Sequence, residues 1–145
     1  MVSKRAGHRN RVVLDGSNIV HGGYRGEGVD GFRLVEAISL YREHGYTVYP
    51  RMKGGTLRYI KRKRIKGYAA LTRETKKEGE TRLITYEKDD DLAIIELALK
   101  KNAWIVTNDT FDGYYDPDYI DKFIDKERQK YDKKYNWKDI DSWIW

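Results

Sequence analysis

The 145-residue chain contains no cysteine, only two prolines and no long hydrophobic run. The absence of cysteine excludes disulfide bonds and thiolate metal sites, and it gives no sign of secretion. No apolar segment approaches the roughly 20 residues that a membrane-spanning helix needs. Residues 1–10 are basic and polar without an apolar core, so we expect a flexible basic tail rather than a signal peptide. We therefore expect a soluble, intracellular protein of the cytoplasm that binds no membrane.

Length and composition predict one folded domain. Hydrophobic residues make up 39% and charged residues 36% of the chain, which is polar for a globular domain but not a disordered composition. We assign residues 1–10 to the tail and residues 11–145 to a single domain. The oligomeric state stays open, and a homodimer is compatible with the sequence.

Short apolar segments alternate with amphipathic ones along the chain, as in an α/β protein. We expect a glycine-rich loop over 16–28, strands over 11–14, 46–49, 82–85 and 103–107, a further short strand near 68–71, and helices over 30–44, 55–66, 92–101 and 119–131. The main strands are uniformly apolar, which is typical of parallel strands covered on both faces. The pattern predicts a three-layer α/β fold with a mostly parallel central sheet and helices on both faces.

Aspartates stand where two of these strands end. Asp15 follows the first strand, Asp109 follows the strand over 103–107, and the cluster 89–91 precedes the apolar helix. Ligands of open α/β sheets bind beyond the carboxyl ends of the strands, so we expect these carboxylates to converge there. Like charges held this close need a counter-charge, and Mg²⁺ or Mn²⁺ suits oxygen ligands. A role as turn former or helix cap explains Asp15 alone equally well and the cluster 89–91 alone better, so the prediction depends on all three together.

Three motifs resemble the Regnase-type NYN domain, a PIN-like ribonuclease. They are Asp15-Gly16-Ser17-Asn18, Asp90-Asp91 and Asn108-Asp109-Thr110, and the resemblance runs from about residue 11 to residue 131. It implies a PIN-like fold with catalytic Asp15, Asp90, Asp91 and Asp109. It also implies that Asn18, in the first loop, helps to order this acidic site and binds the substrate.

The same resemblance implies a divalent metal on Asp15, Asp91 and Asp109, with Asp90 and Asp112 as further candidate ligands. The sequence departs from the family at Gly113, where the family has one more aspartate and where Asp112 precedes by one position.

A basic segment separates the acidic motifs. Nine Lys or Arg residues and no acid occur between Arg51 and Arg73, in a chain of net charge +6. A solvated surface would explain such a run, but the complete lack of acids favours a nucleic acid. The candidates for substrate contact on the expected basic helix are Arg58, Lys61, Arg62, Lys63, Arg64 and Lys66. His21, Tyr24, Arg25, Tyr114 and Tyr115 are further candidates near the acids.

These observations predict a metal-dependent endoribonuclease that hydrolyses single-stranded or looped RNA with a metal-activated water. The main alternative is an RNA-binding module of the same fold with weak or no catalysis. A third hypothesis, a phosphatase or receiver domain, lacks the Asp-x-Asp after the first strand that a haloacid-dehalogenase-like phosphatase would need. The sequence separates neither RNA from DNA nor one metal ion from two.

Overall fold

The computed structural model describes residues 10–22, 28–88 and 90–107. Several predictions concern residues outside these ranges and remain predictions. They are those for the tail 1–9, Asp89, Asp109, Asp112 and the helix expected over 119–131. Among the described residues, no helix is both long enough and apolar enough to cross a membrane.

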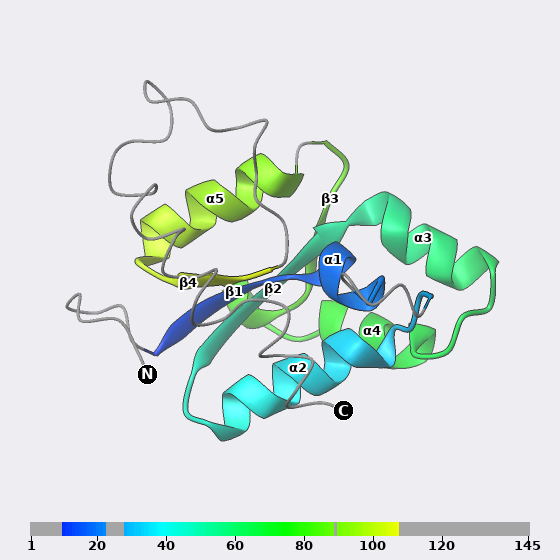
Figure 1. Ribbon diagram of the computed structural model, residues 1–145, viewed down its shortest axis with the longest axis horizontal. Coiled ribbons are helices and arrows are strands. Elements are labelled where there is room, and N and C mark those ends of the chain that lie inside the picture. The colour runs from blue at the N-terminus through cyan, green and yellow to red at the C-terminus, as the bar shows by residue number, and fades with distance from the viewer. Residues whose placement is uncertain (1–9, 23–27, 89, 108–145) are drawn as a thin grey trace.

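A parallel sheet forms the centre of the described fold (Figure 1). Its four strands lie in the order β3-β2-β1-β4 and comprise β1 (Arg11–Asp15), β2 (Thr47–Lys53), β3 (Ile84–Tyr86) and β4 (Trp104–Val106). β1 lies between β2 and β4, and its Leu14 pairs with Pro50 of β2 on one side and Val106 of β4 on the other. Val12, Val13 and Leu14 are fully buried, as the apolar sequence of this strand predicts.

Helices cover both faces of the sheet, which confirms the three-layer α/β prediction (Figure 1). One face carries α5 (Asp90–Lys101), which contacts every strand. The other face carries α1 (Gly16–Val20) and α2 (Phe32–Glu43), and α4 (Tyr68–Thr75) packs against α2. The helix α3 (Gly54–Arg62) follows β2 directly, and a short 3-10 helix, η2 (Gly79–Thr81), precedes β3.

Two local predictions were wrong. The segment 68–71, expected as a strand, begins α4, because Ala69, Ala70 and Leu71 are good helix formers and Ala70 and Leu71 bury one face of that helix. The start of the expected glycine-rich loop is the helix α1, which Asp15 caps by accepting a hydrogen bond from the Asn18 backbone N–H.

The basic segment also differs from its prediction. The expected helix over 55–66 ends at Arg62, and Arg64 has a left-handed φ of 54° that no helix tolerates. Lys63, Arg64 and Lys66 therefore lie in the connection to α4. Strand β2 is longer than expected and contains Pro50, which the sequence placed near an element edge. β3 pairs with β2 only from Arg51 onward, so the missing N–H of Pro50 does not interrupt that ladder.

Candidate active site

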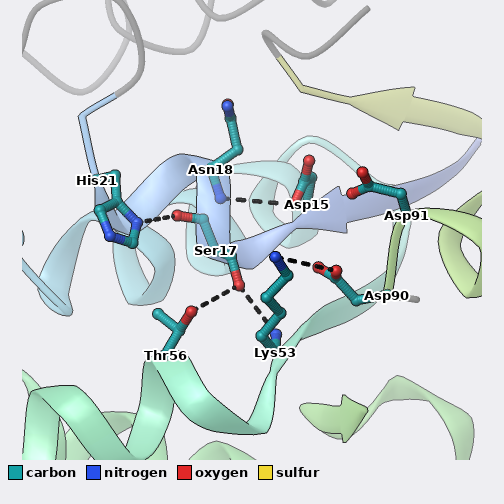
Figure 2. A pocket seen from close by; sticks show the side chains of 8 residues that line it. All are labelled: Asp15, Ser17, Asn18, His21, Lys53, Thr56, Asp90 and Asp91. Atoms are coloured by element: carbon teal, nitrogen blue, oxygen red, sulfur yellow. Dashed lines mark hydrogen bonds and ion pairs between the residues drawn. The ribbon is translucent and has the colours of Figure 1, made fainter. Parts of the chain in front are cut away.

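A pocket of about 280 Å³ opens where β1 ends and α1 begins (Figure 2). Three sequence segments meet there: the turn from β1 into α1, the turn from β2 into α3, and the first turn of α5. The described residues that line it are Asp15, Ser17, Asn18, His21, Lys53, Thr56, Asp90 and Asp91. The structure thus brings three of the four predicted catalytic aspartates to one place.

Asp15 lines this pocket but is almost completely buried, with an exposed fraction of only 3%. The Thr107 hydroxyl donates a hydrogen bond to its Oδ2 at 2.8 Å, and the Asn18 backbone N–H lies 3.5 Å from its Oδ1. Arg51 stands beside it in the strand register, but the guanidinium donates to the carbonyls of Pro50 and Arg82 instead. The Asp15 carboxylate is therefore held by neutral donors.

The environment of Asp15 disfavours its charged form. Burial raises the pKa of the carboxyl group from 3.8 to about 7, against the hydrogen bond from Thr107, which lowers it. The negative charges of Asp91 and Asp90 raise this pKa further. Asp15 is thus poised between its two protonation states near neutral pH, and a cation in the pocket would favour the ionised one.

Asp90 and Asp91 begin α5, where the helix dipole favours negative charge. Asp90 is 3% exposed, and its Oδ1 lies 3.8 Å from the Lys53 ammonium. Figure 2 shows the two carboxylates and Asp15 on the same side of the pocket. The acidic start of this helix, which capping alone would explain, therefore also faces the first-strand aspartate.

Ser17 connects the turns that frame the pocket. Its hydroxyl accepts a hydrogen bond from the Lys53 backbone N–H at 2.9 Å and donates one to the Thr56 hydroxyl at 3.2 Å (Figure 2). Its backbone carbonyl lies 2.6 Å from the His21 Nδ1. One serine thereby fixes α1 against the start of α3.

Gly16 makes this close contact feasible. A Cβ built at this position would lie 2.6 Å from the Arg51 carbonyl oxygen and 2.8 Å from the Leu34 side chain. Only glycine allows α1 to leave β1 at this distance from β2. The close packing of α1 against β2 therefore explains the glycine in the Asp15-Gly16-Ser17-Asn18 motif.

The donor chemistry of the pocket suits a hard divalent cation, since it offers carboxylate and hydroxyl oxygens. Within the described ranges, however, no group of three or more His, Asp or Glu side chains is arranged to hold a metal ion. Asp109 and Asp112, which the resemblance adds to the ligand set, lie outside those ranges. The residues present fit part of a site whose remaining ligands would follow β4.

The basic side chains expected to bind substrate are all exposed. Two of them have acidic partners: Arg58 pairs with Glu87 at 2.5 Å, and Lys66 lies 3.3 Å from Asp30. Arg62 stacks over the Tyr59 ring at 5.7 Å. The remaining members of this cationic surface are Lys61, Lys63 and Arg64, and all six belong to α3 or the segment that follows it.

Four residues of the site were not predicted from the sequence: Ser17, Lys53, Thr56 and Thr107. Ser17 belongs to the first motif, and Thr107 immediately precedes the Asn-Asp pair, so both stood beside positions already singled out. Lys53 and Thr56 had no such signal, because only the pairing of β1 with β2 brings their turn to Asp15.

The model of the Zc3h12a-like Ribonuclease NYN domain family matches residues 8–138 of the chain. The chain belongs to this family. Its match extends from the basic tail through all described elements, and a comparison with curated proteins finds no match. The predicted NYN domain is confirmed, and with it the assignment to a family of ribonucleases. The phosphatase and receiver alternatives find no support in this NYN domain.

Proposed function

We propose that this NYN domain is a metal-dependent endoribonuclease that hydrolyses phosphodiester bonds of single-stranded RNA. The observation that carries the proposal is the convergence of Asp15, Asp90 and Asp91 in one pocket at the carboxyl end of the central strand. Family membership supplies the reaction class. A buried carboxylate with a raised pKa is typical of catalytic sites, which favours the enzyme over an inactive RNA-binding module of the same fold.

Asp15, Asp91 and Asp109 would hold Mg²⁺ or Mn²⁺, with Asp90 and Asp112 as further ligands. A bound divalent ion lowers the pKa of a coordinated water and stabilises charge on the phosphate. Thr107 keeps the Asp15 carboxylate oriented, and the acidic first turn of α5 keeps Asp90 and Asp91 facing it. Asn18 lines the same pocket, where its side chain would contact the RNA.

The cationic surface of α3 would guide the strand to the pocket. Lys53, which precedes α3, and Thr56 in its first turn line the pocket, and the exposed cations of α3 lie toward its other end. Contacts to phosphate give affinity that does not depend on sequence and that weakens with salt. We propose a cytoplasmic RNA as the substrate.

The test is cleavage of a linear and of a circular single-stranded RNA by the purified protein in Mg²⁺ or Mn²⁺. We expect cutting of both, since an endonuclease needs no chain end, and loss of cutting in EDTA. Asp15→Asn and Asp91→Asn should remain folded and lose cleavage by at least about 100-fold.

Glu36→Gln is a matched control, because it removes one exposed carboxylate from α2, which packs on the opposite face from α5. It should cleave like the wild type. Full activity in Asp15→Asn, or equal activity in EDTA, would refute the proposal. RNA binding without any metal-dependent cleavage in the wild type would favour the inactive binding module instead.

A further inference from the structure

Lys53 contributes the one fixed positive charge among the eight described residues that line the pocket. It lies at the last position of β2 and precedes α3, in the middle of the turn that Ser17 anchors. The neighbouring cations of α3 are exposed and do not line the pocket. The Lys53 side chain reaches toward Asp90 (Figure 2).

The two ends of Lys53 are held differently. Its backbone N–H donates to the Ser17 hydroxyl at 2.9 Å, which fixes the main chain beside α1. Its ammonium lies 3.8 Å from the Asp90 Oδ1, and the Lys53 side chain is 62% exposed whereas that of Asp90 is 3% exposed. A buried carboxylate needs a counter-charge, so the ammonium can leave Asp90 for another anion once a bound cation supplies that charge.

We propose that Lys53 is a catalytic residue that binds a non-bridging oxygen of the scissile phosphate. The proposal rests on the function assigned above, because it needs RNA and a cation at the same pocket. The cation would take over Asp90 and its neighbours, and the Lys53 ammonium would then face the incoming phosphate. Its charge stabilises the additional negative charge that develops on the phosphate oxygens as water attacks.

The competing explanation is that Lys53 only neutralises Asp90. In that case its removal would increase repulsion among the carboxylates and make the protein bind Mn²⁺ more tightly. Cleavage at saturating Mn²⁺ would then be unchanged. The two explanations differ in the single-turnover rate measured with both metal and RNA saturating.

The experiment compares the wild type, Lys53→Met, Lys53→Arg and Lys100→Met under those conditions. We expect Lys53→Met to lose about 100-fold in rate, as for removal of one donor to a developing negative charge. Lys53→Arg keeps the charge and should recover much of this loss. Lys100→Met removes an exposed lysine from the opposite end of α5 and should match the wild type.

Thermal unfolding with and without Mn²⁺ accompanies the kinetics and should show Lys53→Met folded and still stabilised by the metal. A Lys53→Met rate within about threefold of the wild type, with the wild type active, overturns the role of Lys53 alone. A wild type that cleaves no RNA overturns the proposed function, and the role of Lys53 with it.

Discussion

Replacement of Asp15 by asparagine should stabilise the metal-free protein at alkaline pH while it abolishes activity. The folded protein holds the Asp15 proton more tightly than the unfolded chain, with a pKa of about 7 against 3.8. The contribution of Asp15 to stability is therefore greatest at low pH and falls as the pH rises from 3.8 through 7. With 1.36 kcal/mol for each pKa unit, ionised Asp15 costs about 4 kcal/mol at pH 8.

Asparagine avoids this penalty because it does not ionise. It has one acceptor oxygen where the carboxylate has two, so it loses one of the hydrogen bonds from Thr107 and the Asn18 N–H, worth about 1 kcal/mol. We expect a net gain of about 3 kcal/mol for Asp15→Asn at pH 8, and about zero at pH 4.5, where the cost of Asp15 has fallen to about 1 kcal/mol and equals the loss of the hydrogen bond.

Urea unfolding of both proteins in EDTA at the two pH values measures these differences. Addition of Mg²⁺ at pH 8 should stabilise the wild type and leave Asp15→Asn unchanged, because the ion binds the folded state through that carboxylate. A variant that is no more stable than the wild type at pH 8 would show that the Asp15 environment does not oppose its charge, and the reasoning would be wrong.

Three further changes test other parts of the site. Thr107→Val removes the donor to Asp15, so we expect a higher Asp15 pKa by NMR titration and about tenfold weaker Mn²⁺ binding, whereas Thr107→Ser should behave like the wild type. Gly16→Ala places a methyl group against backbone and should lower the free energy of unfolding by about 2 kcal/mol or more in urea denaturation; an unchanged value would contradict the close contact. The double variant Lys63→Gln with Arg64→Gln should weaken RNA binding for all sequences alike and lower the slope of log affinity against log salt by about 1 to 2, and an unchanged slope would remove these residues from the RNA path.

The fold was largely predictable because short, uniformly apolar segments mark the strands in the sequence. Val12, Val13 and Leu14 follow one another with no polar residue between them, so neither face of the strand is marked as exposed, and such strands need helices on both sides. The elements that were predicted wrongly depend on tertiary contacts. The helix α4 carries its apolar residues over a single turn, Ala70 and Leu71, which is too short a pattern to separate a helix from a strand.

The sequence predicted the aspartates of the site but not the residues that contact them. Asp15 follows an apolar strand and Asp90 precedes an apolar helix, so both positions were defined by local sequence. Lys53 and Thr107 act through pairings across the sheet, β1 with β2 and β1 with β4, that no local pattern specifies. The same limitation explains the basic segment, where the left-handed Arg64 ends a helix that composition alone would extend.

The position of β1 has a consequence for incomplete chains. It pairs on one side with β2, which the ribosome makes soon afterwards, and on the other with β4, which is made last among the described elements. A chain cut before residue 104 would keep the open edge of an apolar strand, and such edges recruit strands from other molecules. Fragments that end in α5 should therefore aggregate rather than persist as smaller, inactive domains.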